Sequence, residues 1–261
     1  MDRIYDKFVI VCAGNDKNIL GANIMSSYAV STGAVPLHLE WKASSAAIAY
    51  NSGIDSTEQP YLVFAHQDVY LPREWFTWLE GAILDIEERD PTWALIGCWG
   101  IAKDFRHHGF VWSSGVKGLL GRPVINPIEV QSIDELLIVM RRSAGLRFDS
   151  RMPFWHLYGT DIVQTAIANG RSAWVANLPV VHNDSFKGNL DQNFALAYAG
   201  VRNKWRGSLP IRTPVVMIDR CGFGLARYKL NAKRSFRKRA AQCYDPTLDP
   251  RHYAIKCGWS V

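Results

Sequence analysis

Three polar residues, His66, Gln67 and Asp68, end a short apolar run from Tyr61 to Ala65. A run of this length, rich in aromatic and apolar types, predicts a buried strand. Pro72 follows closely, and proline suits the first turn of a helix because its missing N–H is not needed there. Open α/β sheets bind ligands where a strand places polar groups at its carboxyl end, just before a helix. The alternative is a solvated loop with an incidental acid.

A second group of candidates lies further along the chain. Asp161 stands near the start of a predicted helix, from about Thr160 to Ala168, that ends at Gly170. His182 follows a further predicted strand, Ala173 to Val181. An acid near a helix N-terminus interacts favourably with the helix dipole, so a purely structural role is one interpretation of Asp161.

Alternating strands and helices position these groups. The predicted strands are Phe8 to Cys12, Val35 to Trp41 and Tyr61 to Ala65, and the predicted helices are Asp16 to Thr32, Ser44 to Ile54 and Pro72 to Glu88. Strand–helix alternation is typical of a parallel sheet with right-handed crossovers. We therefore expect an α/β fold with a Rossmann-like, mostly parallel central sheet flanked by helices.

The middle of the chain gives a weaker pattern. We expect a strand from Trp93 to Ile101, a long loop over 102–123 that contains His107 and His108, and a helix from Leu190 to Trp205. The segment Ile128 to Arg142 has both a capping-box spacing and a strand-like apolar core, and a strand from Leu136 is favoured.

Length, cysteines and termini limit the class of protein. The 261 residues suit one large α/β domain or two small ones. The five cysteines are scattered and form no CxxC pair, which favours a reduced, cytosolic setting over a zinc knuckle or a disulfide framework. The N-terminus does not resemble a signal peptide, and no apolar stretch approaches the roughly 20 residues that span a bilayer.

Positive charge gathers at the end of the chain. From Arg202 onward there are 14 Lys and Arg against 3 Asp and Glu, whereas residues 1–201 carry a net charge of −5. We expect a catalytic domain over 1–205 and a basic extension over 206–261. Its densest run, Lys229 to Gln242, is compatible with a basic helix that contacts an anionic membrane or another polyanion, or with a solvated extension.

Three segments together resemble the glycosyltransferase family 2-like proteins of the GT-A fold. The first, Ala49 to Pro72, resembles the family's block in which a small-residue segment, a strand and an acidic motif follow one another. The second, Phe148 to Gly170, resembles its block of phenylalanine-aspartate, aromatic loop, acidic pair and helix. The third, Pro179 to Asp184, resembles the strand and histidine that close the site. The resemblance covers roughly residues 8–185.

The resemblance implies a divalent cation that stabilises the diphosphate leaving group of a sugar nucleotide. Asp68 has the metal-ligand position, and His182 would complete the coordination. The family usually has an acid where this chain has His66, and imidazole suits manganese better than magnesium, so we expect Mn²⁺ rather than Mg²⁺. An orienting role for His66 is the alternative.

The same resemblance assigns the remaining site residues. Asp161 matches the base that takes the proton of the acceptor hydroxyl, although its usual glutamate neighbour is Thr160 here. The positions that hold the nucleotide and diphosphate are Ala13, Asp16, Glu40, Asn51, Gln67 and Asp68, and the positions of the acceptor loop are Trp155, His156 and Tyr158. Solvation of Glu40 and simple packing of the three aromatic-loop residues are the alternatives.

We therefore expect a cytoplasmic, inverting glycosyltransferase that takes part in polysaccharide biosynthesis. It would transfer a sugar from a nucleoside-diphosphate donor to a glycan or lipid-linked glycan, with peripheral contact at the inner membrane face through the basic segment. A non-catalytic nucleotide- or glycan-binding module of the same fold is the alternative, since His66 and Thr160 replace two acids. A nucleic-acid-binding function is disfavoured, because the positive charge is confined to the end of the chain and no recognised motif accompanies it.

Overall fold

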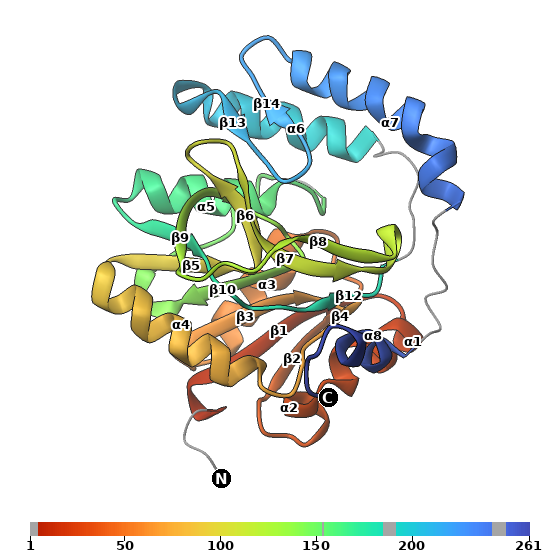
Figure 1. Ribbon diagram of the computed structural model, residues 1–261. Coiled ribbons are helices and arrows are strands. Elements are labelled where there is room, and N and C mark those ends of the chain that lie inside the picture. Colours follow the sequence, from red (N-terminus) through yellow and green to blue (C-terminus); the bar gives the residue numbers. More distant parts are fainter. Residues whose placement is uncertain (1–4, 153, 185–191, 242–248) are drawn as a thin grey trace.

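A curled mixed sheet with helices on both faces forms the centre of the protein (Figure 1). The structure is a computed structural model that describes residues 5–152, 154–184, 192–241 and 249–261. Within these residues the sheet has 12 strands in the order β2-β1-β3-β10-β5-β11-β9-β6-β7-β12-β4, with β8 paired to β7. A separate pair of short strands, β13 and β14, lies outside it.

The strands of the first half are β1 (Phe8–Gly14), β2 (Leu37–Trp41), β3 (Tyr61–His66), β4 (Val69–Tyr70), β5 (Trp93–Gly97), β6 (Trp99–Ala102), β7 (His107–Ser113) and β8 (Gly118–Arg122). Those of the second half are β9 (Ile128–Ile133), β10 (Leu137–Arg141), β11 (Ser172–Val175), β12 (Val181–His182), β13 (Ile211–Arg212) and β14 (Met217–Ile218). The α-helices are α1 (Lys17–Ala22), α2 (Tyr28–Ser31), α3 (Ala46–Ser56), α4 (Trp75–Arg89), α5 (Tyr158–Ala168), α6 (Gln192–Lys204), α7 (Phe223–Ala241) and α8 (Pro250–Lys256).

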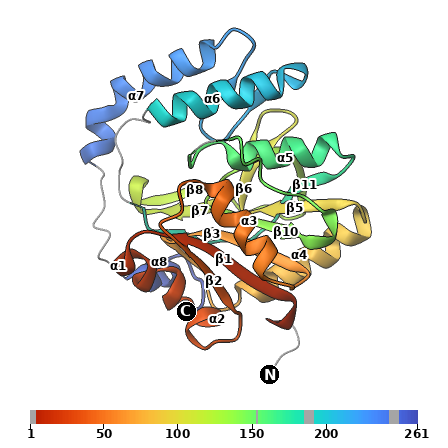
Figure 2. The ribbon, with the colours of Figure 1, turned by 180° about the vertical axis from the view of Figure 1, so that it is seen from behind.

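Alternating side chains of β1 contribute to two core layers. Phe8, Ile10 and Cys12 pack with α1 and α4 on one face, whereas Val9 and Val11 pack with α3 and α5 on the other. Figure 2 shows α3 and α5 covering the face that is turned away in Figure 1. Because both faces of this strand are buried, its sequence is a continuous apolar run and does not alternate between apolar and polar residues.

The prediction of a mostly parallel sheet is wrong. Parallel pairs join β1 to β2 and β3, β5 to β11 and β7 to β12, but the other pairs among the described strands are antiparallel. The central exception is β10, which runs antiparallel between β3 and β5. Its residues Leu137 to Met140 are buried, and an apolar run buried on both faces carries no information about strand direction.

The expected long loop over 102–123 contains a β-hairpin instead, formed by β7 and β8. His107 and His108 are the first two residues of β7 rather than loop residues. The glycines that suggested a loop allow close packing, since a Cβ on Gly121 would lie 1.9 Å from the Trp99 ring. Gly121 also has a φ of +84°, which favours glycine.

Three other elements predicted as continuous are divided. The helix expected over 16–32 is interrupted at Asn23, whose side-chain amide donates to the carbonyl of Ile19 and so competes with the helical backbone. The strand expected over 93–101 divides at Cys98, where the chain passes from β5 to β6. The strand expected over 173–181 divides between β11 and β12 at a segment that includes Pro179, which has no N–H for a ladder.

Segments after α5 build two further apolar clusters. One joins α6 and β13–β14 to Met152 and Leu157, with Leu225 and Tyr228 of α7 packed against it. The other places Tyr253 and Ala254 of α8 against β12 and β7. The division into domains at residue 205 stays a prediction. No helix in the described part of the chain combines the length and the apolar character needed to cross a bilayer.

Candidate functional site

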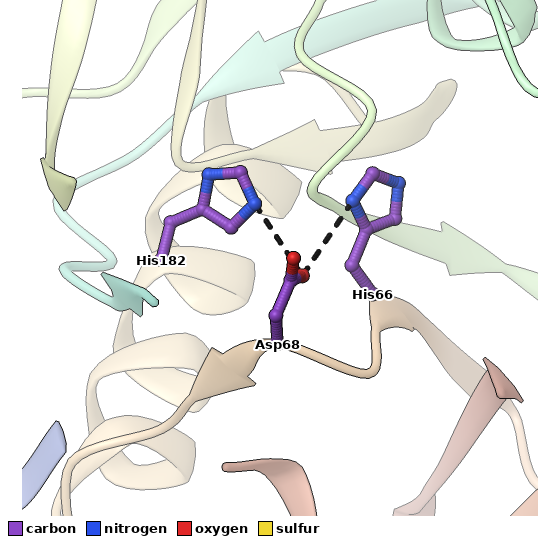
Figure 3. Close-up of side chains that lie close together, drawn as sticks. All are labelled: His66, Asp68 and His182. Atoms are coloured by element: carbon purple, nitrogen blue, oxygen red, sulfur yellow. Dashed lines mark ion pairs between the residues drawn. The ribbon is translucent and has the colours of Figure 1, made fainter. Parts of the chain in front are cut away.

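Two histidines and one aspartate converge at one end of the sheet (Figure 3). His66 ends β3, Asp68 lies in the turn between β3 and β4, and His182 ends β12. The pairing of β4 with β12 brings them together, because it sets Val69 opposite His182 and lets the N–H of Asn183 donate to the carbonyl of Asp68 at 2.8 Å. One ligand atom from each of the three side chains lies within 4.8 Å of the others.

A hydrogen-bond relay fixes the orientation of His66. The hydroxyl of Tyr158 donates to the carbonyl of Glu135 at 2.9 Å, and its oxygen lies 2.8 Å from Nε2 of His66. Because the single phenolic proton goes to the carbonyl, Nε2 of His66 must be the donor to Tyr158. In the neutral ring Nδ1 then keeps its lone pair, and it lies 3.9 Å from Oδ1 of Asp68. An imidazole held through its other nitrogen in this way has the usual arrangement of a metal ligand.

Carboxylates surround His182. Its Nε2 lies 3.4 Å from Asp68 and its Nδ1 lies 3.8 Å from Asp184. Burial alone would lower the pKa of His182, but attraction to Asp68 and Asp184 outweighs burial and raises that pKa to about 9. The carboxylate of Asp184 is held by the N–H of Gly115 and the hydroxyls of Ser113 and Ser114, at 3.1 to 3.3 Å.

A pocket of about 450 Å³ adjoins this cluster. It is lined by groups from the ends of β1, β2 and β3, from α3, from the turn before β10, from the loop before α5 and from the start of α6: Ala13, Gly14, Asn15, Lys42, Ala43, Tyr50, His66, Gln67, Asp68, Glu135, Phe154, Trp155, His156 and Asn193. Six of the residues predicted from the sequence are therefore in its wall: Ala13, His66, Gln67, Asp68, Trp155 and His156. This volume is of the order expected for a small-molecule site.

Gln67 and Asp16 bond to the backbone of the segment that follows β1. The side-chain oxygen of Gln67 accepts from the N–H groups of Asn15 and Asp16 at 2.9 and 3.1 Å. The carboxylate of Asp16 caps α1 by accepting from the N–H groups of Asn18 and Ile19. Both side chains thus hold the turn after β1 in place, and Asp16 is not itself part of the pocket lining.

Glu40 and Asn51 also make structural contacts outside the pocket lining. Glu40 bonds to His38 at 2.7 Å and to the hydroxyl of Ser52 at 2.5 Å. The amide of Asn51 bonds both the N–H and the carbonyl of Phe148, at 3.0 and 2.8 Å. Asn51 therefore joins α3 to the segment that leads into the aromatic loop, and this contact connects two of the segments that resemble the glycosyltransferase blocks.

The aromatic loop has an unusual backbone that Glu135 supports. Phe154 and Leu157 have φ values of +74° and +62°, in a region that non-glycine residues rarely occupy and that often accompanies functional sites. The carboxyl group of Glu135 accepts from the N–H groups of Gly159 and Leu157 at the start of α5. Burial, with a contribution from Asp134, raises the pKa of Glu135 well above its usual range.

Asp161 lies apart from the pocket. Its side chain is only 3% exposed and accepts from Nζ of Lys204 at 2.8 Å and from the indole N–H of Trp205 at 2.7 Å. Lys204 is the last residue of α6 and Trp205 follows it directly, and Lys204 also contacts Asp149 at 2.9 Å. The base role of Asp161 stays a prediction, and in this arrangement two side chains cover its carboxylate.

Sequence reasoning did not identify Lys42, Glu135 or Asp184 as site residues. Glu135 stands at the entrance of β10, where an acid is ordinarily read as a solvated strand end. Asp184 follows His182 by two residues, and this short spacing is the signal that could have identified it. Lys42 follows β2 directly, with a φ of +55°, and only the fold shows that this strand end faces the pocket.

Comparisons with known proteins give distant likenesses. No family model matches the chain. A protein of Fuscovulum blasticum, named ATP synthase subunits region ORF 6, is 27% identical over 173 residues, which are 65% of this chain and 69% of that protein. That name states a genomic region and no activity.

Three solved structures to which the chain is similar share 10 to 12% identity with it. GalNAc-T7 with UDP, GalNAc and Mn²⁺ aligns over 99% of this chain and 59% of its own length, with a TM-score of 0.48. The mannosyltransferase PcManGT of Pyrobaculum calidifontis with GDP-Man and Mn²⁺ aligns over 97% and 76%, with a TM-score of 0.45. A197 from STIV aligns over 66% and 82%, with a TM-score of 0.40. None of these likenesses assigns the chain to a family.

The relay to His66 predicts that Tyr158→Phe weakens binding of Mn²⁺. Without the phenolic oxygen, Nε2 of His66 loses its acceptor, and loss of such a partner typically costs 10- to 100-fold in metal affinity. Titration of free Mn²⁺ by electron paramagnetic resonance measures the effect. Tyr50→Phe is the matched control, because the Tyr50 hydroxyl lies 3.5 Å from that of Tyr158 and does not contact His66. Equal affinities for the two variants would contradict the relay.

The charge on His182 predicts a pH dependence of stability in the metal-free protein. The pKa of His182 in the folded protein, about 9, exceeds the ordinary 6.5. The protonated ring therefore contributes fully to stability below pH 6.5, and this contribution is lost as the pH rises through 9. The difference between the two pKa values corresponds to about 3 kcal/mol of folding free energy. Between about pH 6 and pH 10, with a chelator present, the free energy of unfolding of the wild type should therefore fall by about 3 kcal/mol more than that of His182→Gln. Urea denaturation at each pH measures both. Parallel curves would show that His182 is not protonated in the folded state.

Proposed function

We propose that the chain is a glycosyltransferase that binds a nucleoside-diphosphate sugar in the pocket beside His66, Asp68 and His182. The observation that carries this proposal is the convergence of three metal-capable side chains at the edge of a pocket of about 450 Å³. The pocket lies at the carboxyl ends of β1 and β3, where α/β proteins bind their ligands. The resemblance of three sequence segments to glycosyltransferase family 2 supports the same function.

The residues present fit a divalent cation. Two imidazoles and one carboxylate supply nitrogen and oxygen donors, a set that suits Mn²⁺ better than Mg²⁺. His66 presents a lone pair at Nδ1 because Tyr158 holds its other nitrogen. When bound, such a cation would supply positive charge to the diphosphate as the glycosidic bond breaks.

Other pocket groups would hold the donor. The turn after β1, fixed by Gln67, presents the backbone of Ala13 and Asn15 to the pocket. Lys42 carries a positive charge at the pocket wall that attracts a diphosphate. We assign the nucleotide to this side and the acceptor to the side of Trp155 and His156, whose rings suit a sugar face. A glycan or a lipid-linked glycan is the acceptor class we propose.

Inverting transfer requires a carboxylate that takes the acceptor proton. As the acceptor oxygen bonds to the anomeric carbon, the bond from that carbon to the diphosphate oxygen breaks with its electron pair. Glu135 lines the pocket beside Asp68 and Trp155, whereas Asp161 is covered by Lys204 and Trp205. We propose Glu135 as the proton acceptor in this arrangement. Asp161 would serve only if α6 withdrew from it.

A non-catalytic binding module is the second candidate. The observation that favours it is the state of Asp161, which is buried and bonded to a cation rather than open to an acceptor. Thr160, which replaces the family's usual glutamate, is also buried and bonds to Ser132 at 2.8 Å. Such a module would bind the nucleotide sugar without turnover.

The cation-bridged donor predicts that Asp68→Asn weakens binding of the sugar nucleotide at least tenfold in the presence of Mn²⁺. Calorimetric titration of the wild type with a panel of UDP- and GDP-sugars, with and without Mn²⁺, first identifies the donor. Asp55→Asn is the matched control, because Asp55 is exposed and pairs with Arg147 at the surface. Unchanged affinity in Asp68→Asn would remove Asp68 from the site.

The same titrations separate the two candidate functions. Slow donor hydrolysis or transfer to an acceptor supports the enzyme, whereas tight binding of an intact donor over many hours supports the module. Failure of every donor to bind with Mn²⁺ present would overturn both.

Because Glu135 lines the pocket and Asp161 does not, we expect substitutions of these two carboxylates to affect turnover differently. Glu135→Gln should lower turnover by about a hundredfold or more while donor affinity stays within a few-fold, because general-base catalysis contributes this much. Asp161→Asn should reduce turnover less and act mainly on stability, because the change weakens its bond to Lys204. Single-turnover kinetics and thermal unfolding of both variants measure this. The reverse order of the two losses in turnover would return the base role to Asp161.

A further inference from the structure

One face of α7 carries alternating apolar and basic side chains. Phe223, Arg227, Leu230, Arg234 and Arg237 recur at spacings of four and three residues, so they share one stripe along the helix. All five are exposed, and the exposed fractions of Phe223 and Leu230 are 73% and 50%. We call these five residues the outer stripe. Two large apolar side chains exposed on one helix face mark a candidate interaction surface.

The opposite face of α7 packs against the rest of the protein. Leu225 and Tyr228 pack against the cluster formed by α6 and β13–β14, and Ala232 is buried. Gly224 lies so close to Met217 that a Cβ would meet its carbonyl oxygen at 1.8 Å. Figure 1 shows α7 on the outside of α6, away from the sheet. The helix cannot rotate the outer stripe inward without losing these contacts, so the stripe faces out of the molecule.

Negative charge is scarce along this helix. From Arg220 to Ala241 the sequence has eight Lys and Arg and no Asp or Glu. The acid that directly precedes this segment in the sequence is Asp219. Its carboxylate accepts from the N–H groups of Cys221, Phe223 and Gly224 at the start of α7. The exposed surface of α7 therefore complements an anionic partner.

A cavity of about 580 Å³ opens beside the stripe, between α7 and the β13–β14 hairpin. Phe223 and Arg227 line it together with Arg212 of β13. Within the described part of the chain, neither guanidinium takes part in an ion pair. An arginine binds phosphate oxygens in a bidentate manner, so two of them suit a phosphate headgroup.

We propose that the outer stripe of α7 docks on a membrane surface that contains anionic lipids. Phe223 and Leu230 enter the boundary between headgroups and acyl chains, while Arg227 between them and Arg234 and Arg237 beyond Leu230 extend to the lipid phosphates. A purely electrostatic partner such as a nucleic acid would not require two exposed apolar residues two turns apart. The docking does not depend on the transferase function, because none of the stripe residues lines the pocket beside Asp68.

Sedimentation with lipid vesicles tests the docking on the full chain. The wild type should bind vesicles of phosphatidylcholine with phosphatidylserine, bind phosphatidylcholine alone far more weakly, and dissociate as salt rises. Arg234→Glu with Arg237→Glu should weaken binding by about 25-fold or more, since each basic residue near such a surface contributes about fivefold. Phe223→Ser with Leu230→Ser should weaken it by about tenfold or more, because both lose their apolar insertion.

Matched variants control for charge and hydrophobicity. Arg106→Glu with Arg122→Glu makes the same change in net charge on exposed residues outside α7, and Leu84→Ser with Ile255→Ser removes two exposed apolar residues of α4 and α8. Both control variants should bind vesicles nearly as well as the wild type. Equal losses in stripe and control variants, or vesicle binding insensitive to salt, would overturn the proposal.

Two further measurements distinguish the remaining outcomes. If the arginine variant loses vesicle binding but the Phe223 and Leu230 variant does not, the stripe binds polyanions by charge alone, and the membrane proposal is overturned. Binding of Mn²⁺ and of the donor sugar nucleotide should stay unchanged in every stripe variant. Loss of that binding would show that the change disturbs the fold, and circular dichroism of each variant identifies such a case. Vesicle binding without donor binding would overturn the transferase function and leave the docking intact.

Discussion

The pairing of β4 with β12 is the contact on which the candidate site depends. Each strand has only two residues, yet their register sets Val69 opposite His182 and brings the backbone of Asn183 to that of Asp68. A slip of one residue would turn His182 to the other face of the sheet. Around this short pair, α8 packs Tyr253 in a stack on Trp112, with ring centroids 3.8 Å apart. The end of the chain thus stabilises the strand that supplies one of the three metal-capable side chains.

Electrostatics explains why the site suits a cation. The carboxyl groups of Asp68, Asp134, Glu135 and Asp184 lie close enough to influence one another or His182. Burial is the main cause that raises the pKa of Asp134 and of Glu135, and each added negative charge increases the cost. In the absence of a metal, the raised pKa of His182 favours its protonated ring, which supplies positive charge. A divalent cation bound by His66, Asp68 and His182 would replace that proton with a larger charge.

Local patterns predicted the elements better than their arrangement. The strand that ends at His66 and the start of a helix at Asp16 were predicted correctly, because strand burial and helix N-termini depend on neighbouring residues. The direction of β10 was predicted wrongly, because no pattern within an apolar run encodes direction. The contacts of Tyr158 with His66 and of Asp161 with Lys204 join residues far apart in sequence, and residue spacing cannot predict them. Tyr158 was assigned to the acceptor loop by resemblance, and that role stays a prediction, whereas its hydroxyl orients a candidate metal ligand.

Helix α6 connects the pocket with the outer layer of the molecule. At its start Asn193 lines the pocket, and at its end Lys204 and the adjacent Trp205 hold Asp161. Between these ends, the ring centroid of Phe194 lies 5.9 Å from that of Tyr228 in α7. Because a packed helix moves as a unit, a displacement of α7 that shifts α6 would move both the pocket wall at Asn193 and the groups that cover the carboxylate of Asp161. The C-terminal segments are therefore part of the structure that shapes the site, even though every side chain we assign to the metal lies before Asn183.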